Sequence, residues 1–173
     1  NAVTEIAVGR DGNIDHYRIN REGSRACHIS TTQLHLKDNS HISTFNMSMG
    51  GKLTRNDSNA RLDGEHAVVR MNGLFLVTGD QHVDNHTSMD HAQPNCDSYE
   101  VYKGILDGNS RGVFNGKVYV KQDAQETDAK QLNKNLLLSP NALIHAKPQL
   151  EIYADQVKCT HGATIGQLDE DQI

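Results

Sequence analysis

Aromatic residues are scarce in this sequence, and long apolar runs are missing. Trp is absent, Phe occurs three times and Tyr five times, so that aromatics make up only 5% of the 173 residues. The longest aliphatic runs, residues 74–77 and 136–138, fall far short of the roughly 18 residues that a membrane-spanning helix needs. We therefore expect one domain with a thin aliphatic core and no segment that crosses a membrane.

Basic blocks are also missing. The chain has 17 Lys and Arg residues against 22 Asp and Glu residues, which gives a formal net charge of −5. Proteins that bind nucleic acid or anionic membranes through charge need clustered Lys and Arg to neutralise phosphates. The charge pattern therefore disfavours both kinds of partner.

Cysteine is rare, with Cys27, Cys96 and Cys159 far apart in the chain. An odd number of widely spaced cysteines fits no disulfide framework and is typical of a reducing compartment. We expect a cytoplasmic protein in which each cysteine is first a small packing residue.

Helical periodicity is nearly absent, since no long stretch keeps an apolar residue at every third or fourth position. The single candidate, AQETDAKQLNKN, is polar all round. Short alternating segments instead predict β-strands. They are TEIAVGR, HYRIN, TQLHLK, EHAVVRM, LFLVTG, KVYVK, LEIYA and VKCTHG. Between them stand dipeptides that favour tight turns, namely Asp11-Gly12, Asp63-Gly64, Asn72-Gly73, Asp107-Gly108 and Asn115-Gly116.

Many short strands with few aromatics favour a solenoid over a sandwich or a barrel. In a parallel β-helix each coil stacks on the next, so that a narrow column of aliphatic and small residues forms a sufficient hydrophobic core. We predict an all-β fold of this single-stranded kind. At roughly 20 residues per coil the chain would form about eight coils, spaced about 4.8 Å apart.

The two ends of the sequence suggest a piece of a longer chain. Asn1 is not a Met and shows no signal-peptide pattern, and Asp169 resembles a helix N-cap followed by Glu170 and Asp171 in the first turn. We expect residues 1–168 to form the β-helix core and residues 169–173 to begin a helical domain.

Cys159 and His161 are the first candidate site. In a strand they would share one face while Lys158 and Thr160 point the other way. Thiolate and imidazole are both suitable iron ligands, but two ligands cannot complete a site, so that a partner chain would have to supply the others. The alternative is one buried Cys and one surface His.

His82, His86, His91 and Cys96 form a second constellation, in a stretch that includes Pro94. Two histidines four residues apart bind zinc on a helix, but this segment is extended in character. Solvated histidines are therefore the favoured interpretation. His86 and His91 remain weaker candidates for a metal site in the interior or at an interface.

The second half of the chain has a more specific character. It contains the blocks HTSMDHAQPNCDS, YKGILDGNSRGVFNGKVYV, DAQETDAKQLNKNLLLS and KPQLEIYADQVKCTHGATIGQLDEDQ. These blocks closely resemble the SufB/SufD family of iron-sulfur cluster assembly proteins. Residues 63–87 fit more diffusely. LLLSPNA, KPQLEIYADQVK and the Cys-x-His-Gly-Ala-Thr segment lean towards the SufD branch, with a SufB-like paralogue as the alternative.

The resemblance implies a right-handed parallel β-helix that pairs with SufB near its C-terminal end. It also implies a C-terminal helical domain that docks the ATPase SufC, and a complex that builds nascent clusters from iron and uses reduced flavin. The subunit itself would be a non-catalytic scaffold, in which Cys159 and His161 handle iron or a cluster at the subunit interface. The absence of a Gly-x-x-x-x-Gly-Lys phosphate loop agrees with ATP hydrolysis by a partner. We expect the isolated chain to form a homodimer, because an uncovered solenoid end leaves unpaired strand edges.

Two further classes remain open. Some β-helices are carbohydrate-active enzymes with paired carboxylates, for which Asp80 and Asp84 are candidates, although such grooves usually carry aromatic platforms. The other is a purely structural solenoid, which would tolerate replacement of Cys159 or His161 without any change in function.

Overall fold

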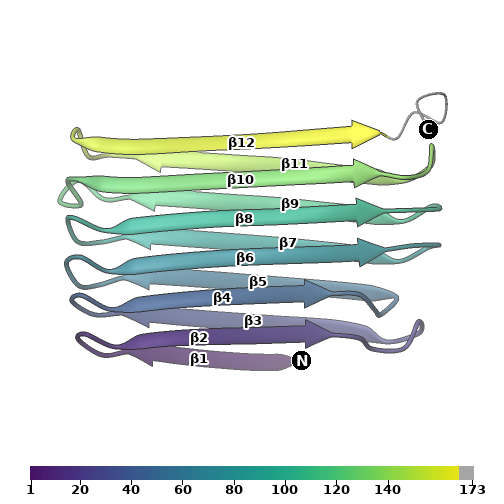
Figure 1. The fold of residues 1–173 in the computed structure, drawn as a ribbon, viewed down its shortest axis with the longest axis horizontal. Coiled ribbons are helices and arrows are strands. Elements are labelled where there is room, and N and C mark those ends of the chain that lie inside the picture. Colours follow the sequence, from purple (N-terminus) through teal and green to yellow (C-terminus); the bar gives the residue numbers. More distant parts are fainter. Residues whose placement is uncertain (168–173) are drawn as a thin grey trace.

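The computed structural model describes residues 1–167 as a stack of twelve β-strands without a helix (Figure 1). Accordingly, none of the described residues belongs to a helix that could span a membrane. One sheet contains β1 (Ala2–Val8), β3 (Cys27–Leu36), β5 (Leu53–Leu62), β7 (His82–His91), β9 (Arg111–Val120) and β11 (Leu143–Ile152). The other contains β2 (Asn13–Asn20), β4 (His41–Ser48), β6 (Val68–Val77), β8 (Asp97–Leu106), β10 (Thr127–Leu137) and β12 (Val157–Gln167). The predicted helical start at residues 169–173 lies outside the described residues.

The two sheets face each other, and every pairing between neighbouring strands is parallel. Each coil consists of one odd-numbered strand, a turn and one even-numbered strand, so that the chain climbs through six coils. In Figure 1 the odd-numbered strands run leftward behind and the even-numbered strands run rightward in front as the chain rises, which makes the coil right-handed. The prediction of an all-β, right-handed parallel β-helix is confirmed.

The predicted size of the coil was wrong. Paired residues lie 26 positions apart for Cys27 with Leu53 and 32 apart for Arg111 with Leu143, so that a coil is longer than the predicted 20 residues or so and six coils replace the expected eight. The reason is that most strands reach ten or eleven residues and that each coil contains two of them. The segment AQETDAKQLNKN, which is polar on all sides, lies mostly in β10.

Two of the predicted turns were also wrong. Asn72-Gly73 lies inside β6 and Asn115-Gly116 lies inside β9. Both glycines occupy inward-facing positions. They are needed there because a larger side chain would not fit, and not because the chain turns. A Cβ atom at Gly73 would overlap the Tyr102 ring, and one at Gly116 would overlap the amide of Gln131.

One corner of the coil repeats a left-handed backbone residue. Each such residue stands one or two positions before an even-numbered strand, and at four of the five its amide donates to a carbonyl of the next coil, as Asp11 N does to Asp38 O at 3.0 Å. Asp and Asn tolerate this conformation better than most residues other than glycine. The residues with this positive φ are Asp11, Asn39, His66, Asn95 and Glu126.

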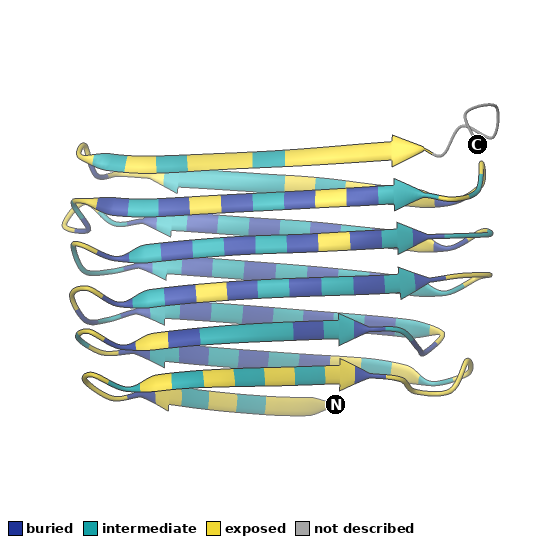
Figure 2. Cartoon of the chain, viewed as in Figure 1, coloured by how far each residue is buried: buried dark blue, intermediate teal, exposed yellow. Residues whose placement is uncertain are grey.

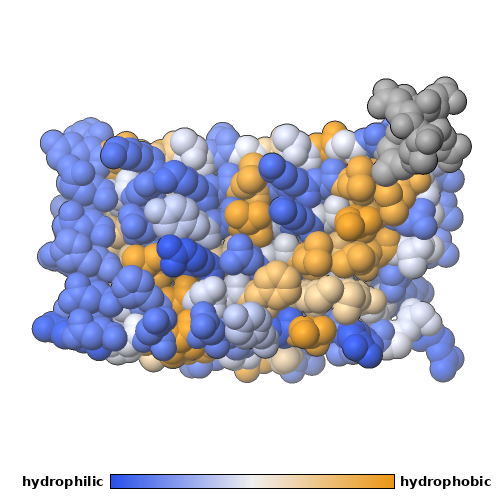
Figure 3. Space-filling model, in the orientation of Figure 1, coloured by the Kyte–Doolittle hydropathy of each residue, from blue (hydrophilic) through white to orange (hydrophobic). Residues whose placement is uncertain are grey.

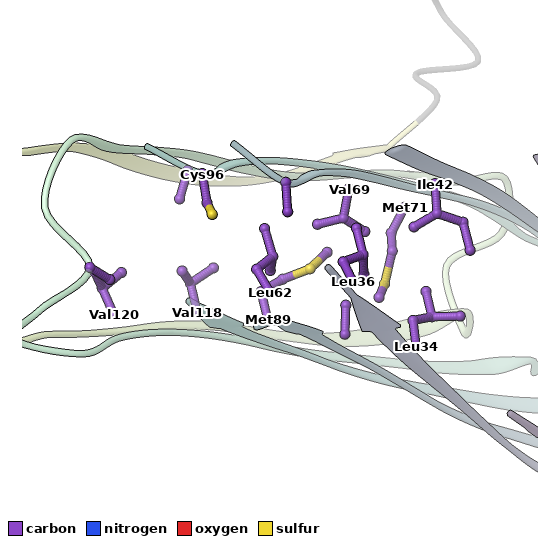
Figure 4. Close-up of a cluster of buried hydrophobic side chains, with 14 of the residues drawn as sticks. Leu34, Leu36, Ile42, Leu62, Val69, Met71, Met89, Cys96, Val118 and Val120 are labelled. Carbon is purple, nitrogen blue, oxygen red and sulfur yellow. The ribbon is translucent and has the colours of Figure 1, made fainter. Parts of the chain in front are cut away.

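Along the strands of the middle coils, buried residues alternate with less buried ones, as the banding in Figure 2 shows. The interior contains two hydrophobic clusters. The larger one includes Leu36, Leu62, Val69 and Met89 (Figure 4), and the smaller one is built around Phe75 and Leu106. They supply the aliphatic core that the sequence predicts.

A row of polar side chains runs between these two clusters. In β7, Asn85 and Thr87 lie between Val83 of the smaller cluster and Met89 of the larger one. We call this row the polar band. Its members are Arg18, Ser30, Asn46, Asn56, Ser58, Asn85, Thr87, Glu100, Tyr102, Gln131, Asn133 and Asn135.

The packing of Tyr102 over Gly73 yields a test of the fold. Tyr102 is buried and its ring also contacts Phe114, with 5.3 Å between the ring centroids, so that it has little room to move. Overpacking costs about 1 to 3 kcal/mol, whereas replacing glycine inside a strand recovers only about 0.5 to 1 kcal/mol. Gly73→Ala should therefore lower the free energy of unfolding by about 1 to 2 kcal/mol in urea denaturation. The outward-facing Asn72→Ala should change it by less than about 0.5 kcal/mol; equal effects of the two substitutions would contradict this packing.

Candidate functional site

Cys159 and His161 lie on the same face of β12, the outermost strand of its sheet (Figure 1). The register sets Cys159 beside Ala129 and His161 beside Gln131, and both partners on β10 are buried in the interior. The two candidate ligands therefore face the interior side of the last coil, while Lys158 alternates to the outer face. The shared face agrees with the alternation in the sequence.

The two side chains differ in their surroundings. Cys159 is half-buried against the larger hydrophobic cluster, and burial raises the pKa of its thiol. His161 is exposed, because no further strand of the described chain stacks on β12. A thiol with a raised pKa is a weak ligand until a metal or a nearby cation favours its thiolate. His161 is thus the more accessible donor of the pair.

No metal site is complete within the described part of the chain. Among residues 1–167 no group of three or more His, Cys, Asp or Glu side chains is arranged to hold a metal ion. Cys159 and His161 can therefore contribute two ligands, and a four-coordinate centre would need donors from another molecule.

The second constellation is split between the two faces of β7. His86 lies on the outer face, where its Nε2 is 2.9 Å from Asp84 Oδ1, whereas His91 points into the core. His82 begins β7 and also faces outward, and Cys96 is buried in the turn before β8. His86 and His91 therefore do not form a joint site.

His91 and Cys96 are packing residues. His91 is fully buried with its Nε2 2.8 Å from Ser98 Oγ, and burial lowers the pKa of the imidazole to about 4. Burial raises the pKa of the Cys96 thiol to about 11, and its Sγ donates to the carbonyl of Gly64 at 3.2 Å. Both side chains are thus enclosed by the core, away from the outer face on which His86 lies.

The carboxylates considered for a carbohydrate-active enzyme are not a catalytic pair. Asp80 stands exposed in the turn after β6, while Asp84 lies on β7 and accepts a hydrogen bond from Arg55 Nη1 at 2.6 Å. Arg55 also binds Asp57, so that the charges form a compensated network on the outer face.

Glu100 is a buried residue that the sequence analysis missed. Its side chain lies in the polar band, where Oε2 accepts a hydrogen bond from Gln131 Nε2 at 2.7 Å. Burial raises the pKa of this carboxyl to about 7. Its alternation with Ser98 and Tyr102 in SYEVYKGIL was the available signal, because those residues also face inward.

The outer face of the second sheet has a separate character. Apolar side chains form a diagonal strip over it (Figure 3), including a hollow of about 310 Å³ beside Leu74, Ile105 and Leu136. A second hollow of about 370 Å³ lies where β8, β10 and β12 run side by side, near Tyr99 and Lys130. Both lie on the side opposite to the one that the Cys159 side chain faces.

Comparison with known proteins identifies the family. The model of the family described as SUF system FeS cluster assembly, SufBD core domain, matches residues 1–173. The chain belongs to the SufBD family. The prediction from the sequence blocks is confirmed at this level, and the carbohydrate-active alternative is not supported.

Individual SufBD relatives agree with this assignment. The chain is 34% identical to the iron-sulfur cluster assembly protein SufD of Escherichia coli over 97% of its own length and 40% of the relative's. It is 37% identical to a SufBD family protein of Synechocystis over 100% and 38% of the two lengths. It is 33% identical to the chloroplastic protein ABCI7 of Arabidopsis thaliana over 100% and 37%. The chain thus spans about two fifths of these relatives.

The buried His91 makes a prediction for this SufBD core. Its pKa of about 4 in the fold lies below the ordinary imidazole value of 6.5, so that only the unfolded chain binds a proton between these values. The contribution of the neutral His91 to the free energy of unfolding should be fully present above about pH 6.5 and be lost as the pH falls towards 4. The loss amounts to about 3 kcal/mol, at about 1.4 kcal/mol per pH unit.

The measurement is urea unfolding as a function of pH. His91→Leu should remove this part of the pH dependence. Val120→Ala, at the position paired with His91, should lower the free energy of unfolding at every pH and leave its slope against pH unchanged. If His91→Leu kept the full slope, the imidazole would not be a neutral core residue.

Proposed function

We propose that this chain is the β-helix core of a SufD-type scaffold subunit, which pairs with SufB in the complex with SufC and takes part in building nascent iron-sulfur clusters. The observation that carries the proposal is the placement of His161 and Cys159 on one face of β12, an edge strand, where no third ligand joins them among residues 1–167. Membership of the SufBD family and similarity to SufD support it.

In this role His161 provides an imidazole to iron or to a nascent cluster at the subunit interface, and Cys159 provides a thiolate once metal lowers its pKa. SufB supplies the remaining donors. The subunit is a non-catalytic scaffold, ATP hydrolysis belongs to SufC, and reduced flavin is a cofactor of the whole complex. The free cysteines Cys27, Cys96 and Cys159 suit a cytoplasmic location.

The decisive experiment uses the full-length protein co-purified with SufB and SufC. His161→Ala should leave β-sheet content and thermal stability nearly unchanged, because the side chain is exposed. Cluster content of the complex should fall at least about tenfold, as expected for loss of a ligand or of a proton-transfer group. The effect of Cys159→Ala should be smaller, because Cys159 also packs against the core.

Thr160→Ala is the matched control. Thr160 lies between the two candidates on the same strand but alternates to the other face. It should retain full cluster content. Normal assembly with His161→Ala, or unfolding of that variant, would refute the role given to His161.

The position of β12 at the edge of its sheet also predicts self-association of the isolated chain. β12 has one unpaired edge among the described residues, and Ile165 on it is 53% exposed. Unpaired parallel strands and exposed apolar residues favour a symmetric contact with a second copy. Light scattering should show a concentration-dependent homodimer that Ile165→Lys weakens at least about tenfold, whereas Ile29→Lys on β3, an exposed residue on a strand that is paired on both sides, should not. A monomer at all concentrations would contradict this interface.

A further inference from the structure

Glu100 is the single carboxylate on the inward faces of the described strands. It is 2% exposed and lies midway along β8, between the two hydrophobic clusters. No Lys or Arg side chain is within ion-pair distance of it in the described chain. Burying a carboxylate without a cation costs free energy, so that Glu100 does not serve the stability of the fold.

Several neighbours of Glu100 in the polar band have polar atoms without a hydrogen-bond partner. Glu100 Oε1 and Thr87 Oγ1 both lack one, although the Thr87 hydroxyl is close enough to oppose the rise in the pKa of Glu100. An unsatisfied buried polar atom costs about 1 to 3 kcal/mol, and ordered water normally meets such groups. The band atoms without a hydrogen bond of good geometry are Asn46 Nδ2, Asn85 Nδ2, Thr87 Oγ1, Glu100 Oε1, Gln131 Oε1 and Asn135 Oδ1. Of these residues, Asn46 lies close enough to Tyr102 to act on the pKa of its phenol.

The register leads from Glu100 to the end of the solenoid. Glu100 pairs with Gln131 on β10, and Gln131 pairs with His161 on β12. Successive strands are about 4.8 Å apart, so that Glu100 is about 10 Å below the last strand. Gly116 on the opposite sheet leaves the room that the Gln131 amide occupies.

We propose that the polar band binds a row of water molecules, and that Glu100 exchanges protons through this row with the end of the solenoid where His161 lies. The carboxylic acid releases its proton to a band water and becomes a carboxylate that accepts a hydrogen bond from Gln131 Nε2. The proton leaves along the water row towards β12, and the reverse transfer restores the acid. The use of this proton exchange in cluster assembly rests on the proposed function, whereas the existence of the buried proton site does not.

The titratable groups around Glu100 agree with this role. Tyr102 is next on the same face of β8, and burial, followed by the charge of Glu100, raises the pKa of its phenol. Arg18 lies further along the band and acts on Tyr102 in the opposite direction. His91 from β7 is neutral at pH 7, and β6 contributes the apolar Met71 beside Glu100. No neighbour therefore forces Glu100 to be fully charged, and a carboxyl with a pKa near the working pH is suited to proton exchange.

The first test observes the carboxyl directly, by NMR of the protein labelled with ¹³C at the glutamate carboxyl carbon. One resonance should titrate near neutral pH, be absent from Glu100→Gln and persist in the exposed control Glu5→Gln. Gln131→Leu should move its pKa upward, because it removes the donor that favours the carboxylate. A Glu100 resonance that stays ionised down to about pH 5, or never titrates up to about pH 9, would overturn the proposal.

The second test measures the water row and its use. Magnetic relaxation of bound water should report long-lived internal water in the wild type and less of it in Gln131→Leu; an interior without such water would also overturn the proposal. In the complex with SufB and SufC, Glu100→Gln should flatten the pH profile of the initial assembly rate and slow assembly at least about tenfold at its optimum.

These readouts separate the two proposals. If His161→Ala left assembly normal while Glu100 still titrated near neutral pH in a hydrated interior, the role of His161 would fail and the proton site would stand. If Glu100→Gln left the pH profile of assembly unchanged, the proton site would have no part in assembly, whatever His161 does.

Discussion

Parallel, in-register stacking of the coils is the constraint on which the whole molecule depends. Each inward position lies directly above its counterpart one coil below, so that a side chain must fit its own column as well as the opposite sheet. Leu36 and Leu62 continue one apolar column, and Gly73 makes room for Tyr102 in another. The same rule gathers polar residues into a band, because a buried polar group needs a polar neighbour in the next coil.

Alternation in the sequence was enough to predict strands, and missing helical periodicity predicted that residues 1–167 contain no helix. The parallel coils were predicted from the scarcity of aromatic residues and from the family resemblance. Alternation was not enough to predict the length of a coil, because coil length is set by where the chain turns. Asn72-Gly73 has the composition of a tight turn, yet it lies within β6, where Gly73 is needed for space beside Tyr102. A local dipeptide signal cannot reveal a requirement imposed by a residue about thirty positions away, at the scale of one coil of this kind.

The geometry of the candidate site was also predictable only in part. The spacing of two between Cys159 and His161 fixed their common face, and the odd spacing between His86 and His91 already implied opposite faces of β7. That Cys159 would be half-buried and His161 exposed depends on the stacking of β12 on β10, which spacing alone does not contain. Glu100 escaped notice because acids are ordinarily read as exposed, although its alternation with Ser98 and Tyr102 was visible.

The repeated left-handed corner makes each coil a separable unit of length. Because Asp11, Asn39, Asn95 and Glu126 repeat one backbone geometry and one hydrogen bond to the next coil, a coil can be gained or lost without a new kind of turn. The distance between the two ends of such a solenoid then changes only in whole steps of about 4.8 Å. β-Helices with this corner can therefore differ in the distance between their two ends by whole coils while keeping the same turn.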